Sequence, residues 1–308
     1  MKDATPETVR DRMQAASERI ARVKLWDRVA RGVITTGGLG IVASVLFIFL
    51  FIAGEAWPLF QPASAPRLED SPNPSALRGA LTLGSDEYQR KLYGLLPKGT
   101  LTLANIAAGT LDKEEEVPGL DGATLTAASR NATGTLLTAG TSDGRAALIH
   151  LRFQPQYEDA KLADVSSSIR MEPLVEIDPA HRPVRLVDGR EREDTSVLAA
   201  VVGEREIVVL RRTPDDTGYE RQILEVGPSE RITHISLGRT EHLAAATDRG
   251  GLYLWELDSP IRLVDNRSLA PSKVTALAWA NADISLLVGD DQGGLAAFFR
   301  VRVNDDDP

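Results

Sequence analysis

The sequence contains no cysteine among its 308 residues. A disulfide framework and a metal site built from cysteine thiolates are therefore both excluded. Aromatic residues are scarce as well, at 5% of the chain, whereas alanine, leucine, valine, threonine, glycine and aspartate are common. This composition is typical of many short strands and turns, and not of a disordered chain. Because cysteine-free proteins work in both redox compartments, the missing residue does not locate the protein.

Charge is absent from one long stretch, Gly32–Gly54, which lies between Arg31 and Glu55. A helix of this length spans roughly 34 Å, enough to cross a hydrocarbon core of about 30 Å. Its second half, Val45–Ile52, is apolar on every face, unlike an amphipathic helix of a soluble protein. The sequence therefore predicts a transmembrane helix over residues 32–56, with a buried core helix as the alternative.

A cleaved signal peptide is a second alternative for this stretch. Signal peptides have an apolar region of about 7–15 residues behind a short basic segment. Here 31 residues precede a longer apolar run, and the cleavage-like sequence Ala63-Ser-Ala65 lies well beyond its end. We therefore expect an uncleaved anchor.

The charges are distributed unevenly on the two sides of this predicted helix. Residues 1–31 contain eight basic and five acidic residues, whereas the rest of the chain contains 27 basic and 39 acidic residues. The positive-inside rule then places the N-terminus in the cytosol and the large C-terminal region outside, as a single-pass protein. The acidic exterior region argues against a nucleic-acid partner.

The segments on either side of the predicted span have simpler patterns. Residues 1–31 are expected to form a cytosolic amphipathic helix that starts at Thr5-Pro6-Glu7. It would either lie against the membrane or a partner subunit, or serve as a solvated lead-in. Residues 57–80 are rich in proline, serine and alanine, which predicts a linker.

Small residues recur at helical spacing within the predicted span, at Thr36, Gly40 and Ser44. Residues of this size at this spacing let the backbone of a second helix approach closely. We expect these three positions to form a helix-packing face against another transmembrane helix. The alternative is glycine that a lone anchor tolerates.

Residues 81–308 contain repeats of one pattern: a strand, a turn, a strand of small residues, an Asp/Gly turn, and a strand that ends in a large apolar residue. The clearest copies cover residues 125–149, 232–255 and 274–299, with a weaker copy over 184–210 and a partial one over 95–103. A repeat of about 40–45 residues with several short strands is typical of β-propeller blades. The predicted fold is therefore mainly β, a β-propeller-like domain of WD-repeat-like blades over residues 81–308 behind one N-terminal transmembrane helix.

The spacing of the turn glycines supports this prediction and adds two details. They occur at positions 99, 144, 203, 250 and 293, and the one long interval contains Phe153–Pro179, interpreted as an insertion between blades. Five blades are few, and the last repeat has three strands, so we expect the ring to be incomplete and completed by a partner or a further C-terminal portion. A generic antiparallel sandwich is the alternative fold.

No pattern in the sequence points to catalysis, a cofactor or a metal. The four histidines, His150, His181, His234 and His242, have no metal-ligand spacing and are interpreted as structural or surface residues. Nucleophile-elbow, P-loop and dinucleotide-binding motifs are absent in context. The acidic residues of the turns are too sparse for a calcium loop. We therefore expect a protein that is not an enzyme, with no cofactor.

The order of features from Arg28 to Ala63 resembles a known family. A basic lead, a glycine-rich apolar helix and the exit Glu55-Ala-Trp-Pro-Leu-Phe-Gln-Pro-Ala63, followed by β repeats, are similar to the long form of the phosphate ABC transporter permease, PstC type. The resemblance implies a non-catalytic, single-pass part of a phosphate-import permease in a bacterial inner membrane. Its N-terminus would be cytoplasmic, and residues 81–308 would form a periplasmic docking or regulatory domain. The implied partners are the transmembrane helices of permease subunits and, through them, an ABC ATPase and a phosphate-binding protein.

The sequence departs from that family in one large respect. It has no second apolar run, so the translocation helices and the loop that engages the ATPase are missing. Two hypotheses remain: the N-terminal part of a phosphate-import permease, or a stand-alone membrane-tethered β-propeller that serves as a periplasmic interaction scaffold.

Overall fold

The structure is a computed structural model that describes residues 6–60, 75–106, 108–215, 218–238, 241–258, 260–280 and 284–299, with helix side chains at residue 24 and from residue 26 onward. It divides into two compact units, Met1–Glu69 and Asp70–Pro308, which are treated separately below.

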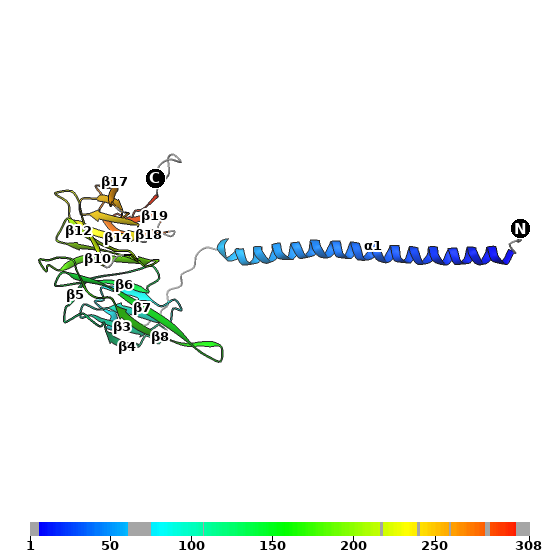
Figure 1. Cartoon of the computed structure of the whole chain (residues 1–308), viewed down its shortest axis with the longest axis horizontal. Coiled ribbons are helices and arrows are strands. Elements are labelled where there is room, and N and C mark those ends of the chain that lie inside the picture. The colour runs from blue at the N-terminus through cyan, green and yellow to red at the C-terminus, as the bar shows by residue number, and fades with distance from the viewer. Residues whose placement is uncertain are drawn as a thin grey trace. The chain divides into compact units, whose positions relative to one another are not determined.

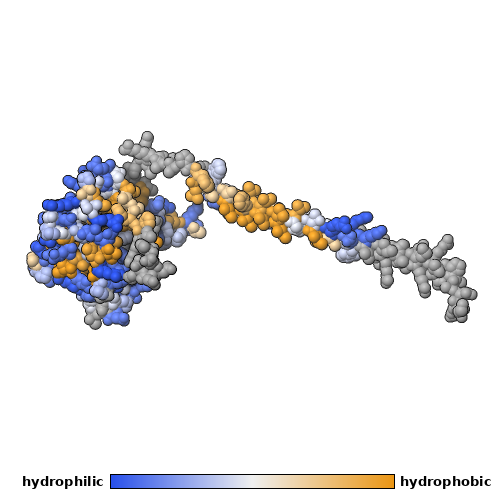
Figure 2. Space-filling view, turned by 90° about the horizontal axis from the view of Figure 1, so that it is seen from above, coloured by the Kyte–Doolittle hydropathy of each residue, from blue (hydrophilic) through white to orange (hydrophobic). Residues whose placement is uncertain are grey.

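The first unit is one long helix, α1 (Pro6–Ala56), followed by the 3-10 turn η1 (Trp57–Phe60) (Figure 1). The two helical segments expected on either side of residue 31 therefore form one continuous helix. An 18-residue window within Trp26–Phe60 reaches a mean hydropathy of 2.4, and the apolar side chains of this stretch form a continuous hydrophobic band (Figure 2). By length and composition this helix is able to cross a membrane as a single-pass anchor, a test that a signal sequence also meets.

The second unit consists of five consecutive antiparallel sheets among the described residues, here called blades 1–5. The first two follow the turn η2 (Ser75–Leu77) and have these strands: β1 (Thr82–Ser85), β2 (Lys91–Leu95), β3 (Thr100–Asn105) and β4 (Leu111–Glu116) in blade 1; β5 (Leu125–Arg130), β6 (Leu136–Thr141), β7 (Arg145–Glu158), β8 (Lys161–Met171) and β9 (Val175–Glu176) in blade 2.

Blades 3–5 continue the same up-and-down order of strands. Their strands are β10 (Val184–Arg192), β11 (Thr195–Val202), β12 (Glu206–Arg212) and β13 (Glu220–Glu225) in blade 3; β14 (Ile232–Gly238), β15 (His242–Thr247), β16 (Gly251–Glu256) and β17 (Arg262–Ser268) in blade 4; β18 (Val274–Ala280), β19 (Ser285–Asp290) and β20 (Leu295–Phe299) in blade 5. Successive four-stranded meanders of this kind confirm the predicted β-propeller-like, mainly β fold.

The hydrophobic core lies between the blades and not within one central layer. Four clusters of buried side chains join blade 1 to 2, 2 to 3, 3 to 4, and 4 to 5. In β15, Leu243 and Ala245 face blade 3, whereas Ala244 and Ala246 face blade 5, and all four are fully buried. The second strand of a blade is therefore apolar on both faces, and its alanines allow neighbouring sheets to approach closely.

The first strands of consecutive blades lie against one another: β1 contacts β5, β5 contacts β10, β10 contacts β14, and β14 contacts β18. The blades thus follow one another in chain order, with blade 1 at the lower end of the β unit and blade 5 at the upper end in Figure 1. Each blade contributes its central strands to the cores on both sides, which is the packing that the repeats predict.

The turn glycines have the conformation that their spacing implied. Gly99, Gly144, Gly203, Gly250 and Gly293 each lie between the second and third strands of a blade, with φ of 75–81°. A side chain is disfavoured at such angles, which explains glycine at all five turns.

One predicted boundary is wrong. The segment Phe153–Pro179 does not separate two blades, because it extends β7 and supplies β8 and β9, all of which pair within blade 2. β7 and β8 form a long hairpin that projects from the lower part of the unit in Figure 1. The end of the expected linker also belongs to the β unit, since Leu77 is buried there and lies against blade 1.

Candidate functional site

The predicted helix-packing residues Thr36, Gly40 and Ser44 lie in α1 and are exposed. The Ser44 hydroxyl donates a hydrogen bond to the Gly40 carbonyl oxygen at 2.9 Å, so its polar group is satisfied within the helix. This back-bond lets a hydroxyl reside in an apolar segment without a partner from another helix. The packing of another helix on this face stays a prediction.

Three of the four histidines have the structural surroundings expected of them. His181 is exposed, and its Nδ1 lies 3.2 Å from the carbonyl oxygen of Asp143. His242 packs beside Trp279, with ring centroids 5.9 Å apart. His234 is half-buried, and burial lowers the pKa of its imidazole. These side chains contribute to turns and blade packing.

His150 differs, because the structure brings two carboxylates beside it. Its Nε2 lies 3.4 Å from Glu172 Oε1, and its Nδ1 lies 3.6 Å from Glu191 Oε2. His150 is in β7, Glu172 follows β8, and Glu191 is in β10, so the group lies where blade 2 meets blade 3. The local spacing of His150 in the sequence does not indicate these two neighbours. The three residues are far apart in the sequence, and only the pairing of blades brings them together.

Neighbouring polar side chains hold the two carboxylates in place. Arg212 donates hydrogen bonds to both oxygens of Glu172 at 3.1 and 3.3 Å, and the Tyr219 hydroxyl lies 3.3 Å from Glu172 Oε2. Burial and the Glu172 charge raise the pKa of Tyr219 to about 12, so this hydroxyl stays a hydrogen-bond donor. The Ser196 hydroxyl donates to Glu191 at 3.4 Å.

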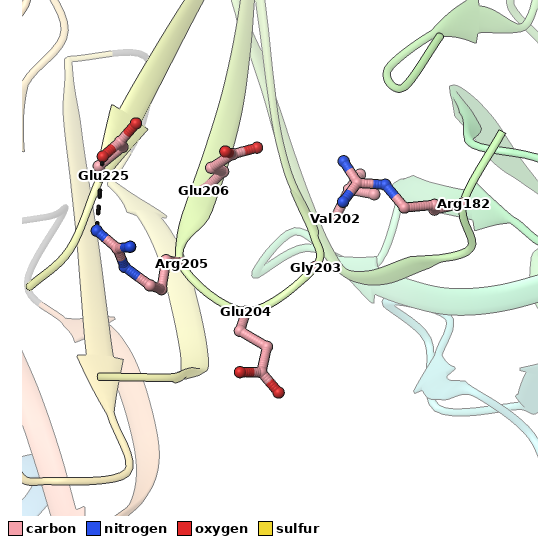
Figure 3. A pocket seen from close by; sticks show the side chains of 7 residues that line it. All are labelled: Arg182, Val202, Gly203, Glu204, Arg205, Glu206 and Glu225. Atoms are coloured by element: carbon pink, nitrogen blue, oxygen red, sulfur yellow. Dashed lines mark ion pairs between the residues drawn. The ribbon is translucent and has the colours of Figure 1, made fainter. Parts of the chain in front are cut away.

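A hollow of about 210 Å³ opens at the turn Gly203–Arg205 between β11 and β12 (Figure 3). Arg205 points toward Glu225, with 3.7 Å between their charged atoms, and Arg182 lies on the other side of the turn, where Asp178 holds its guanidinium at 2.8 Å. Both arginines are therefore paired with carboxylates. Because carboxylates already pair with both arginines, this hollow shows no feature that would bind an anionic ligand.

The outer face of blade 5 is a third feature, and it is apolar and exposed. Residues directly opposite each other in antiparallel strands point to the same face of the sheet. On this face lie three cross-strand rows, Ala276/Gly289/Leu295, Ala278/Leu287/Ala297 and Ala280/Ser285/Phe299. None of these residues is charged, and Leu295 and Phe299 are 75% and 66% exposed. We call this set of rows the open face.

The matching face of blade 4 shows what usually covers these positions. Leu252 in β16 follows the same Gly-Gly turn as Leu295 in β20. Leu252 is only 5% exposed, because it packs with Val274, Leu286 and Val288 of blade 5. The open face therefore has the composition of an interface between blades while being exposed to solvent.

No protein-family model and no curated protein matches the sequence. Among solved structures, the chain is similar to the β-propeller domain of Cps50 (Swd1) from Myceliophteria thermophila, with 14% sequence identity and a TM-score of 0.48. The alignment covers 75% of this chain and 69% of that one. The β-propeller-like assignment rests on the five consecutive sheets themselves.

Proposed function

We propose that this protein is a non-catalytic, membrane-anchored interaction module. The apolar part of α1 serves as a single-pass anchor, with the N-terminus in the cytoplasm and the β unit in the periplasm. The open face of blade 5 docks a partner. The observation that carries this proposal is the exposed face of blade 5, which has no charged residue. A sheet face that stays in contact with water usually carries polar side chains.

The occupant that fits the open face is an apolar antiparallel β-sheet of a partner subunit. Within this chain, the equivalent faces of blades 1–4 are each covered by the following sheet. The open face continues this series with the same alternation of small and large apolar residues, so a sheet presenting a similar surface would complete the fifth interface. A charged partner surface matches it less well, because the three rows carry no charged residue.

The resemblance of residues 28–63 to the long-form phosphate permease supports a more specific proposal. In it, this chain is part of a phosphate-import ABC transporter, and Thr36, Gly40 and Ser44 pack on the transmembrane helices of permease subunits. An ABC ATPase and a phosphate-binding protein are then indirect partners. The β unit provides the docking or regulatory surface outside the membrane.

The experiment is isolation of the full chain in mild detergent from phosphate-starved cells, followed by identification of the proteins that accompany it. Wild type is compared with Leu295→Glu, which places a charge on the open face, and with Leu263→Glu, a control at a half-exposed leucine of β17. We expect permease subunits and the ATPase to accompany wild type and the control. We expect the variant to lose the partner that docks on the open face at least about tenfold, because a buried charge costs several kcal/mol.

Three outcomes overturn parts of the proposal. Isolation of the chain alone removes the permease context. Equal recovery of partners with Leu295→Glu removes the open face as the docking surface. Self-association in light scattering that Leu295→Glu abolishes identifies a second copy of this chain as the occupant.

The stand-alone scaffold remains the second candidate, and it predicts that residues 67–308 fold without any partner. Denaturation of that fragment then shows a single cooperative transition. An aggregating or loosely folded fragment counts against this candidate.

A further inference from the structure

The geometry points to a binding site for a divalent transition-metal ion, with Zn²⁺ as the test ion, formed by His150, Glu172 and Glu191. The site lies at the junction of blades 2 and 3 and does not depend on the proposed docking function. One potential ligand atom from each residue lies within 4.8 Å of the other two. An imidazole nitrogen with two carboxylate oxygens is a ligand set that Zn²⁺ and its neighbours in the first transition row accept.

The spacing of the first pair matches that of two ligands on one ion. Metal–ligand bonds of about 2.0–2.2 Å in a tetrahedral zinc site place the ligand atoms roughly 3.3 Å apart. His150 Nε2 and Glu172 Oε1 are 3.4 Å apart. Glu191 Oε2 lies 3.6 Å from the other ring nitrogen, Nδ1, and the Glu191 side chain is one-third exposed. To complete the set, this side chain would rotate toward Nε2.

The imidazole nitrogen in this pair, His150 Nε2, is a buried polar atom without a hydrogen bond among the described residues. His150 Nε2 is shielded from solvent, and no hydrogen-bond partner for it exists among the described residues, although the Glu172 oxygen is near. Buried polar atoms are nearly always paired, and an exception calls for an explanation such as an ion. A neutral imidazole directs a lone pair from this atom, and a metal ion would satisfy it together with the facing carboxylate.

The surrounding side chains provide the support that metal ligands usually have. Arg212 and Tyr219 hold Glu172, and Ser196 holds Glu191. Such outer contacts fix the orientation of ligands before the ion arrives. The two carboxylates are opposed by one guanidinium, that of Arg212, and this excess of carboxylates favours a cation.

An ion at this position would connect β7, the segment after β8, and β10. These elements belong to two neighbouring blades, which otherwise meet through an apolar core. Metal binding would therefore stabilise the junction between blades 2 and 3. The alternative for the same geometry is an ion-free arrangement in which a protonated His150 bridges the two carboxylates.

The test uses the full chain in detergent, treated with a chelator and then titrated with ZnCl₂ by calorimetry, with thermal unfolding as a second measurement. Wild type is compared with His150→Gln and with His181→Asn. The second variant is a control that removes an exposed imidazole from the loop between β9 and β10. We expect one Zn²⁺ per chain and a raised Tm for wild type and the control. For His150→Gln we expect at least about tenfold weaker binding.

Folding of the His150→Gln protein is checked by its circular dichroism and Tm without metal. A second variant, Glu191→Gln, changes only the more exposed ligand. In a separate measurement, Co²⁺ replaces Zn²⁺, and its absorption in the visible range reports whether nitrogen and oxygen ligands surround the ion. We expect a tetrahedral Co²⁺ spectrum in wild type that Glu191→Gln weakens.

The proposal is overturned if wild type shows no saturable Zn²⁺ binding, or if His150→Gln and wild type bind equally. A different result would also overturn it. In that result the Tm of wild type rises below about pH 6 but does not respond to Zn²⁺, and His150→Gln removes the rise. That result would identify the protonated histidine bridge in place of a metal site.

Discussion

Lys91 is the clearest case of a charged residue whose surroundings decide its role. Its side chain is 2% exposed, and its ammonium donates to Asp112 at 2.7 Å in blade 1 and lies 2.8 Å from Asp164 in blade 2. Burial alone would lower the pKa of this ammonium, but the hydrogen bonds to the two carboxylates outweigh burial and raise it. Lys91 therefore stays charged and ties the β7–β8 hairpin to the first blade.

Replacement of this lysine tests that role. Lys91→Met leaves two carboxylates that are partly exposed and able to hydrate, so we expect the free energy of unfolding to fall by about 1–3 kcal/mol. The control is Lys113→Met, whose lysine is 51% exposed and paired with Glu115, and which should cost less than about 0.5 kcal/mol. Denaturation followed by the β-sheet circular dichroism gives both values, and equal losses would contradict the assigned role.

Asp178 predicts how stability depends on pH. The Arg182 side chain, helped by backbone N–H donors, lowers the pKa of this buried carboxyl from its ordinary value of 3.8 to about 2. A lowered pKa in the folded state means that the contribution to stability is present above about pH 4 and is lost as the pH falls toward about 2. We expect Asp178→Asn to lower stability at neutral pH and to flatten its decline over that acid range.

The measurement is the denaturation midpoint at a series of pH values. Asp215→Asn, at an exposed turn residue, is the control and should follow wild type throughout. A decline as steep as that of wild type in Asp178→Asn would exclude the Arg182 pair as its source.

At the residue scale, sequence reasoning was limited by distance along the chain. Histidine and glycine types and their local spacing were visible, and glycine at each turn was correctly explained by backbone conformation. The carboxylates beside His150 could not be predicted, because Glu172 and Glu191 reach it only when the long hairpin of blade 2 pairs and blade 3 packs beside it. No local motif signals such a group.

At the scale of elements, two equivalent glycines provide a matched comparison. Gly250 and Gly293 occupy the same turn in blades 4 and 5, with φ of 77° and 81°. A Cβ at Gly250 would lie 2.9 Å from the backbone at Ala270 and Ser272, whereas a Cβ at Gly293 would meet nothing within 4 Å. The two positions therefore share a conformational cost and differ in packing.

We expect Gly293→Ala to cost about 1–2 kcal/mol, the penalty for a side chain in the left-handed region. Gly250→Ala should cost about 1–3 kcal/mol more, because backbone atoms must shift. Denaturation of both variants measures the difference. Equal costs would mean that the loop before β18 yields without penalty.

The strands that the sequence predicts are the first three of blades 2–5 and the central part of blade 1. They pack on both faces, so their apolar residues form runs that contrast with the Asp/Gly turns. The outer strands β4 and β17 were missed because most of their residues are exposed and charged or polar. For the same reason the sequence predicts β8 as part of an insertion. Its composition does not indicate a strand of blade 2, and only its pairing with β7 does.

At the scale of the whole molecule, the row of blades predicts a gradient of protection. Among the described residues, blade 4 is packed on both sides, whereas blade 5 has a neighbouring blade on one side. We therefore expect amides of β18–β20 to exchange with solvent faster than those of β14–β16, in a hydrogen-exchange experiment on the full chain. The equivalent strands of blade 3, β10–β12, serve as a second internal reference and should resemble blade 4.

Uniform exchange across blades 3, 4 and 5 would contradict this gradient. Protection of β18–β20 that appears only when partner proteins are present would instead support docking at the open face.

The succession of blade-to-blade cores has a mechanical consequence. In the chain the helix precedes blade 1, and the open face lies on blade 5. A pulling force between the helix and the open face would therefore pass through four apolar interfaces in series. In a series arrangement the weakest interface sets the load at which the unit separates. A single strengthened junction would not raise that load, unless it were the weakest one.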